Sequence, residues 1–278
     1  MKTRSLAMLV VVAALTGLLS AGEADTVPDV GLTLTGEEAV DFLTTADVSS
    51  KPEDFDDLAI TSPRRLELTK GDRTLRVIFK DENTLYRGMF KFGDGREVPM
   101  VKDSYLHEVA AFELARMLGL DMVPACVERK LFNRKGSLCL WIEGAMTESE
   151  RKKKDLEPPD RRLFNQQMFT VRLFQQLISD QDFSNIRNIL VDDDFRVYKV
   201  DSSLAFYPES KLISQLQPPV YSREAMAALR ALDRDELVRG LEPWLTKDQL
   251  KSLWERREKI LERADKLVKE HGEDKILY

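Results

Sequence analysis

The chain is organised around residues 177–206, LISDQDFSNIRNILVDDDFRVYKVDSSLAF, where a short loop is followed by an apolar strand, an acidic turn and a return strand. Asn188 leads the first strand, and Asp201 ends the second one thirteen positions later. A tight hairpin would bring these strand ends together, and amide and carboxylate oxygens suit a hard divalent cation such as Mg²⁺. Asp182, just upstream, could orient an attacking hydroxyl. Metal holders plus one positioning carboxylate are what phosphoryl transfer requires.

A lysine and a glutamate in the preceding region fit the same chemistry. The strands predicted from residue 64 onward end in Lys80, and a helix is predicted over residues 105–120 with Glu108 near its start. Glu108 would pair with Lys80 and hold its ammonium group towards the phosphates of a nucleotide. Each residue also has a simpler interpretation, as a strand-end surface lysine and as a first-turn charge that favours the helix dipole.

The motifs EVAAFEL at 108–114, NILV at 188–191 and VDSSLAF at 200–206 resemble the atypical branch of the protein-kinase-like superfamily. This branch includes phosphoinositide kinases, bacterial persistence-toxin kinases and secretory-pathway kinases, and the resemblance spans roughly residues 66–206. It implies an α+β, two-lobed fold, with a small antiparallel-sheet N-lobe that carries one helix and a mostly helical C-lobe. It also implies ATP, or another nucleoside triphosphate, with Mg²⁺ or Mn²⁺.

The loop leaves more than one assignment open. In related kinase loops the positioning aspartate usually precedes the metal asparagine by five residues, whereas here Asp182 lies six and Asp180 eight before Asn188. A rival register pairs Asp180 with Asn185. We favour Asn188 and Asp201 as metal ligands, Asp182 as the acceptor-positioning group with Asp180 behind it, and Asn185 as a helper for phosphate or a second metal. The alternative is a solvated acidic hairpin without metal.

The nucleotide grip departs from the kinase pattern. No Gly-x-Gly-x-x-Gly motif exists, and the first hairpin turn carries only Gly71. Three further glycines lie in a long insert at 81–103, which could fold over the site. The backbone around Glu143 would form the hinge between lobes and face an adenine ring. The histidine that often accompanies the loop aspartate is also missing.

Composition and the N-terminus limit the functional class and the compartment. The 42 basic and 48 acidic residues give a net charge of −6, and nothing indicates a nucleic-acid partner. Only two histidines are present, which argues against zinc chemistry and a Ser-His-Asp hydrolase. Residues 1–24 have the positive start, apolar run and small residues of a secretory signal peptide. The expected protein is exported, periplasmic or secreted, with no stable membrane span after cleavage.

The two cysteines, Cys126 and Cys139, lie in two strands predicted around a turn at 133–136. A turn centred there places the two cysteines off register, which disfavours a bridge. We therefore expect two small buried residues, although an oxidising compartment would permit a disulfide.

The predicted organisation is a signal peptide at 1–24, a polar linker at 25–63, an N-lobe at 64–145 and a C-lobe at 146–278. The function that fits is transfer of a phosphoryl group from a nucleoside triphosphate to a hydroxyl of a protein, sugar or small molecule. The alternatives are a catalytically silent pseudokinase, a protein nucleotidyltransferase and an unrelated α+β binding protein. A periplasm holds little ATP, which favours the pseudokinase.

Overall fold

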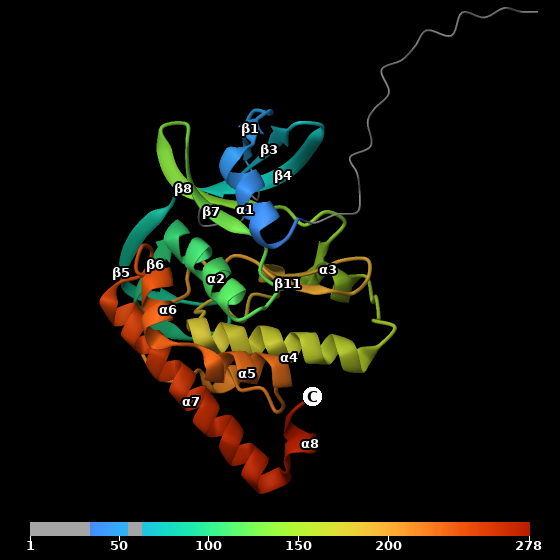
Figure 1. Cartoon of the computed structure of the whole chain (residues 1–278), viewed down its shortest axis with the longest axis vertical. Helices are drawn as coiled ribbons and strands as arrows, with labels where there is room; N and C mark the ends of the chain where they lie inside the picture. Colours follow the sequence, from blue (N-terminus) through green and yellow to red (C-terminus); the bar gives the residue numbers. More distant parts are fainter. Residues whose placement is uncertain (1–33, 55–62) are drawn as a thin grey trace, which may run out of the picture. The chain divides into compact units, whose positions relative to one another are not determined.

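The computed structural model describes residues 34–54 and 63–278. The predicted signal peptide lies outside the described residues. Within them the chain is a mixed α+β structure with two lobes (Figure 1).

The N-lobe is built on an antiparallel sheet of six strands in the order β1-β3-β4-β8-β7, with β2 paired to the outside of β3. Its strands and helices are β1 (Asp47–Val48), β2 (Glu53–Asp54), β3 (Arg64–Lys70), β4 (Arg73–Lys80), β7 (Cys126–Leu131), β8 (Arg134–Leu140), α1 (Gly36–Thr45) and α2 (Tyr105–Met117). Alternating apolar residues of β3 and β4 point into one core, which α2 covers from below in the view of Figure 1. Helix α2 contacts β7 and β8, and β4 lies next to β8 in the sheet, which places Lys80 at the end of β4 beside Glu108 of α2.

The segment at 25–63, expected to be a linker, supplies part of this core. Ala39, Phe42 and Leu43 of α1 are buried and pack with the apolar side chains of β3, β4, β7 and β8. Thr35 stands at the N-cap of α1 but makes no capping hydrogen bond through its side chain. Helix α1 therefore packs as part of the N-lobe, because burial of its apolar face outweighs the polar composition of its surroundings.

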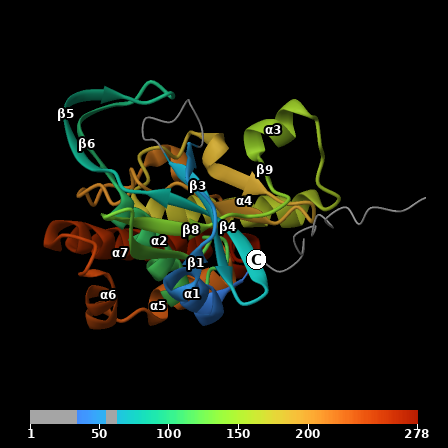
Figure 2. The same ribbon diagram turned by 90° about the horizontal axis from the view of Figure 1, so that it is seen from above.

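Between β4 and α2 in the sequence, the chain forms a second antiparallel sheet of two strands. It consists of β5 (Asn83–Lys91) and β6 (Glu97–Ser104), which pair only with each other among the described strands. Figure 2 shows this hairpin arching away from the main sheet. It occupies the long insert that the sequence places after Lys80.

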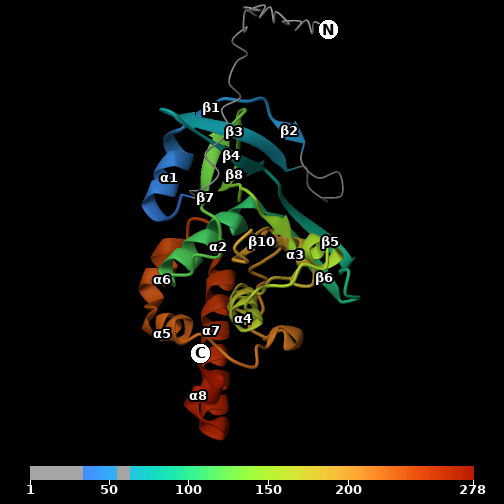
Figure 3. The same cartoon turned by 90° about the vertical axis from the view of Figure 1, so that its right-hand side faces the viewer.

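The C-lobe is mostly helical. Its elements are β9 (Met146–Thr147), α3 (Glu148–Lys153), α4 (Arg161–Ile178), η1 (Ile186–Asn188), β10 (Ile189–Val191), β11 (Val197–Lys199), η2 (Ser214–Leu216), α5 (Arg223–Ala231), α6 (Arg234–Leu241), α7 (Lys247–His271) and α8 (Glu273–Ile276). In Figure 3, α7 runs beside α4 and α5, and their facing apolar side chains form the main core of this lobe. The hairpin β10–β11 forms as expected, with Ile189 opposite Lys199.

The expectation for the cysteines was wrong. Strands β7 and β8 are joined by a two-residue turn at Phe132 and Asn133, both with positive φ, rather than by a turn at 133–136. Such a turn matches the right-handed twist of the flanking strands. It places Cys126 directly opposite Cys139, with Cα atoms 4.0 Å apart, and the two residues form a disulfide.

Across both described ranges, none of the helices combines the length and the hydrophobicity that crossing a lipid bilayer demands.

Candidate functional site

Lys80 lies at the centre of the site. It is the last residue of β4, and its ammonium nitrogen lies 2.8 Å from a carboxylate oxygen of Glu108 and 2.8 Å from one of Asp201. The Lys80 and Glu108 side chains are only 12% and 9% exposed, whereas that of Asp201 is 42% exposed. The expected contact between Lys80 and Glu108 is therefore present. Lys80 additionally joins the sheet of the N-lobe to the end of the β10–β11 hairpin.

The charges in this cluster stabilise one another. Burial by itself lowers the pKa of Lys80, but the carboxylates of Asp201 and Glu108 outweigh that effect and raise the pKa above its ordinary value. Burial acts in the opposite direction on Asp201, and the neighbouring Lys80 holds the pKa of that carboxyl well below its usual range. Lys80 is thus a cation, and Asp201 a carboxylate, throughout the neutral pH range.

The turn that follows β11 is held from both sides. Asp201 has φ +55°, a conformation that costs a residue with a side chain about 1–2 kcal/mol. The backbone N–H of Ser202 donates to Glu108 (3.0 Å), and the hydroxyl of Ser203 donates to Asp201 (3.1 Å). Lys199, fully buried, donates to the carbonyls of Val200 and Asp201 at 2.6 and 2.8 Å. These contacts hold the Asp201 carboxylate in place beside Lys80.

Asp182 is oriented by two asparagines of its own loop. Its Oδ2 accepts hydrogen bonds from the side-chain amides of Asn185 and Asn188, both at 2.9 Å. Asn185 is the N-cap of the 3₁₀ helix η1 and Asn188 is its last residue, so the two side chains lie one turn apart on the same side. Burial raises the pKa of Asp182, although the Asn185 amide partly opposes it. A carboxylate with a raised pKa is a better proton acceptor.

Asp180 has a different environment. Its side chain is fully buried, its Oδ2 lies 3.2 Å from the ammonium nitrogen of Lys199, and its Oδ1 accepts the backbone N–H of Asp182 at 3.0 Å. Gln175 donates to the same carboxylate. Asp180 is therefore buried behind the loop, where its carboxylate fixes the backbone of Asp182. Asp182 is the aspartate of the loop that is only partly buried.

The two asparagines differ in how far their side-chain oxygens remain available to bind a metal ion. The side-chain amide N–H of Asn188 donates a hydrogen bond to Asp182, and the Oδ1 of Asn188 accepts only a long one, at 3.4 Å, from the amide of Asn185. The oxygen of Asn185 already accepts the backbone N–H of Arg187 at 3.2 Å. Within the described ranges, no group of three or more His, Cys, Asp or Glu side chains could hold a metal ion. A cation here would have to use amide oxygen, phosphate and water beside Asp201, as Mg²⁺ commonly does.

Two buried titratable residues beside the cluster were not identified from the sequence. Asp103, at the end of β6, is 5% exposed, and its Oδ1 has no hydrogen-bond partner. Burial raises its pKa to about 6, and the nearby Ser203 and Lys80 side chains partly oppose the rise. His107, preceding Glu108, contacts the carbonyl of Ser203 (2.8 Å) and the side chain of Gln249 (2.9 Å), and burial lowers its pKa to about 4. The only available signal was their position next to the predicted site.

Glu143 lies in the connection that follows β8. Its carboxylate pairs with Arg76, whose guanidinium also lies 5.4 Å from the ring centroid of Trp141. This pair fixes the course of the predicted hinge. A role for the Glu143 backbone in binding an adenine stays a prediction.

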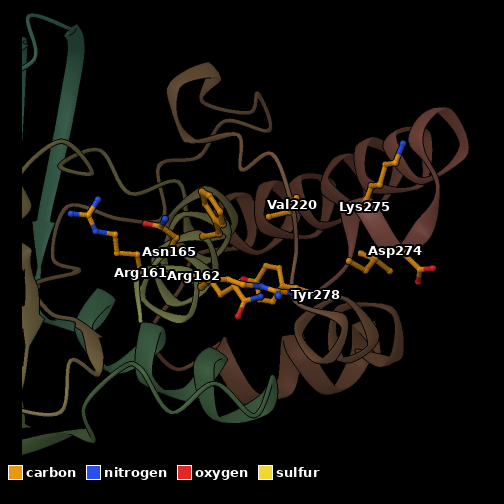
Figure 4. Close-up of a pocket in the computed structure, with 10 residues that line it drawn as sticks. Arg161, Arg162, Asn165, Val220, Asp274, Lys275 and Tyr278 are labelled. Atoms are coloured by element: carbon orange, nitrogen blue, oxygen red, sulfur yellow. The ribbon is translucent and has the colours of Figure 1, made fainter. Parts of the chain in front are cut away.

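A separate hollow of about 490 Å³ lies between the start of α4 and the last residues of the chain (Figure 4). Arg161, Arg162 and Lys275 contribute positive charge, while Phe169 and Tyr278 contribute aromatic surface. None of the predicted site residues lines it.

Comparison with solved structures identifies the fold. The chain is similar to the structure of hydra Fam20 with sugar, at a TM-score of 0.61 and 15% sequence identity, over 86% of this chain and 90% of that one. It is also similar to the Helicobacter pylori proinflammatory kinase CtkA, at a TM-score of 0.52 and 12% identity, over 82% of this chain and 98% of that one. No protein-family model and no curated protein matches the sequence. The two-lobed, kinase-like fold predicted from the motifs is confirmed.

Proposed function

We propose that this chain is an exported, atypical kinase-like phosphotransferase that moves a phosphoryl group from ATP, or another nucleoside triphosphate, to a hydroxyl acceptor. The observation that carries the proposal is the position of Lys80, which contacts Glu108 and Asp201 at the same time. One of the two structural neighbours, the Helicobacter pylori protein CtkA, is a kinase, which supports phosphoryl transfer as the reaction class.

Lys80 would contact the phosphates of the nucleotide, and Glu108 would keep its ammonium group aimed at them. Asn188 and Asp201 would hold a divalent cation, which when bound neutralises charge on the phosphates. The donor set fits such an ion, because the Asp201 carboxylate is accessible and the Asn188 oxygen is the less occupied end of its amide. Asn185 is the weaker candidate ligand, because its oxygen is already used within the loop.

Asp182 would orient the acceptor hydroxyl and take its proton. Two amide N–H groups fix one of its oxygens, which leaves the other to accept a hydrogen bond from the acceptor. Burial raises its pKa and makes it the stronger base. Asp180 and Lys199 would act through the loop backbone rather than on the substrate.

The acceptor class to test first is a sugar hydroxyl, because the hydra Fam20 neighbour was solved with a sugar. Protein and small-molecule hydroxyls form the other arms of the same test. The disulfide between Cys126 and Cys139 supports export, since such bonds persist mainly in oxidising compartments.

The experiment that tests the proposal is a thermal-shift titration of the mature chain, residues 25–278, with ATP and Mg²⁺ or Mn²⁺. A nucleotide at one hundred times its Kd stabilises the folded state by about 2.7 kcal/mol, which shifts the Tm of a chain of this size by roughly 5–10 °C. We expect the shift to require metal and to disappear in Asp201→Ala and Lys80→Ala. The matched controls are Asp193→Ala and Lys130→Ala, which remove the same charges from exposed positions.

Turnover is then measured as ADP release with each acceptor class. Asp182→Asn should keep the nucleotide shift and lose turnover. A metal-dependent shift without any turnover would identify a pseudokinase, and release of pyrophosphate instead of ADP would identify a nucleotidyltransferase. No shift with any nucleotide would overturn the enzyme proposal altogether.

A further inference from the structure

The turn of the β5–β6 hairpin contacts the loop that carries Asp182. The guanidinium of Arg96 donates to the backbone carbonyl of Gln181 and, at 3.3 Å, to its side-chain oxygen. The same group lies 4.3 Å from the ring centroid of Phe183. Gln181 and Phe183 are the two neighbours of Asp182 in sequence. Arg96 thus holds the loop on both sides of the aspartate proposed to position the acceptor.

Arg96 is itself held by the hairpin. Asp94 accepts from its Nε at 2.6 Å and from its backbone N–H at 3.1 Å. The buried ring of Phe92 lies 5.0 Å from the guanidinium on another side. The turn is closed by a hydrogen bond from the Phe92 N–H to the Arg96 carbonyl (2.9 Å), and Gly95, at φ +85°, supplies the left-handed residue it needs. The guanidinium is therefore fixed before it contacts the loop.

Gln181 is also restrained on the loop side. Its side-chain nitrogen donates to the carbonyl and to the hydroxyl of Ser179, both at 3.1 Å. Its backbone N–H donates to the carbonyl of Leu204 at 3.3 Å, in the segment that follows Asp201. A contact on Gln181 therefore bears on the loop and on its link to the metal-site turn, rather than on one mobile side chain.

We propose that Arg96 is a positioning residue for the transfer reaction, and that it makes the β5–β6 hairpin part of the acceptor side of the site. This inference rests on the proposed function. Arginine suits the task because its planar guanidinium can donate from two nitrogens to Gln181 while its face stacks on Phe183, which a lysine cannot do. Arg96 donates its hydrogen bonds to Asp94 and Gln181, and among the described residues none of these bonds reaches Lys80, Glu108 or Asp201. Its loss should therefore change turnover and leave nucleotide binding intact.

The test uses the full chain in three variants. Arg96→Ala removes the contact, Arg96→Lys keeps only the charge, and Arg87→Ala is the control, because Arg87 lies exposed on the same hairpin. Hydrogen exchange is measured over residues 179–185, the ATP shift is measured with Mg²⁺, and turnover is measured as ATP hydrolysis, with water as the acceptor. In Arg96→Ala we expect faster exchange in this loop, an unchanged ATP shift and a 10- to 100-fold lower turnover number, the loss typical of a misplaced catalytic group.

We expect Arg96→Lys to resemble the alanine variant and Arg87→Ala to resemble the wild type; the lysine variant also serves as the milder change if the alanine variant does not fold. For Arg96→Ala, three results would each overturn the positioning role. They are unchanged exchange in the loop, faster exchange with unchanged turnover, and a loss of ATP affinity as large as the loss of turnover. A wild-type chain that binds ATP but hydrolyses none would overturn it too. If the wild type binds no nucleotide, the proposed function fails along with the catalytic part of this inference, and the exchange comparison alone decides whether Arg96 fixes the loop.

Discussion

Replacement of Asp103 by asparagine should stabilise the protein at neutral pH. The Asp103 carboxyl is 5% exposed, has one oxygen without a hydrogen-bond partner, and lies near the carboxylates of Asp201 and Glu108. Burial, followed by repulsion from these carboxylates, raises its pKa from an ordinary 3.8 to about 6, although Ser203 and Lys80 partly oppose the rise. The folded state therefore holds a proton at pH values where the unfolded chain has already lost it.

The sign and size of the effect follow from linkage. Between pH 4 and 6 the folded state binds more protons than the unfolded state, so the contribution of Asp103 to stability falls as the pH rises through this window. One unit of pKa corresponds to 1.36 kcal/mol, and the rise to about 6 therefore costs about 3 kcal/mol above pH 6. Asp103→Asn has the same shape without the charge. It should gain up to about 3 kcal/mol at pH 7 and almost nothing at pH 4.

The assay is urea unfolding, followed by circular dichroism, of the wild type and Asp103→Asn at one-unit steps from pH 4 to pH 8. The difference in unfolding free energy between the two proteins isolates Asp103 from the other titrating groups. Glu97→Gln removes an exposed carboxylate from the same strand and should change stability by less than about 0.5 kcal/mol. A difference that does not grow between pH 4 and pH 7, or a less stable Asp103→Asn at pH 7, would refute the reasoning.

The remaining predictions concern stability elsewhere in the fold. Burial lowers the pKa of His107 from 6.5 to about 4. The unfolded chain therefore binds a proton at His107 before the folded state does, and the free energy of unfolding should fall by about 3 kcal/mol as the pH falls from 6.5 to 4. In urea unfolding over that pH range, His107→Gln should lack this decrease. Replacing Cys126 and Cys139 together by alanine should lower the free energy of unfolding by about 3 kcal/mol, because the disulfide restricts the unfolded chain. The reduced wild type should unfold at the same urea concentration as the double variant. A Cβ on Gly136 would lie 2.3 Å from the carbonyl oxygen of the last residue of β4. Gly136→Ala should therefore lower the free energy of unfolding by about 1–3 kcal/mol and abolish the ATP-induced rise in Tm. Gly93 has open space around it, so Gly93→Ala should keep the stability and the ATP-induced rise of the wild type in the same thermal-shift assay.

The parts of the site that are local in sequence were predictable. Asn188 and Asp201 flank one short hairpin, so the strand pattern alone brings them near each other. Lys80 ends an apolar strand, and Glu108 lies in the first turn of the next helix. Their contact joins residues 28 positions apart, and the strand–helix order together with the family motifs was enough to anticipate it. The roles proposed for these residues remain to be tested.

The cysteine pair marks the limit of this approach. The sequence places two strands around a turn, but a shift in the centre of that turn decides whether Cys126 faces Cys139. Turn conformation fixes register in a hairpin, and here Phe132 adopts a positive φ that its residue type does not favour. The register depends on how β8 pairs with both β4 and β7 in the folded sheet. No local signal in the sequence identified this register.

The sequence by itself indicated the fold class through the resemblance that the motifs at 108–114, 188–191 and 200–206 carry, and it indicated the hairpin around the acidic turn, because strand pattern and spacing depend on a few neighbouring residues. Only the tertiary structure decided that Arg96 contacts Gln181 across 85 positions and that His107 contacts Gln249 across 142. It also decided that Asp180 is sealed against Lys199 while Asp182 is held by two asparagines. The physical reason is that burial and electrostatic environment are properties of the packed chain. Two aspartates two residues apart become different groups only when the rest of the molecule closes around one of them.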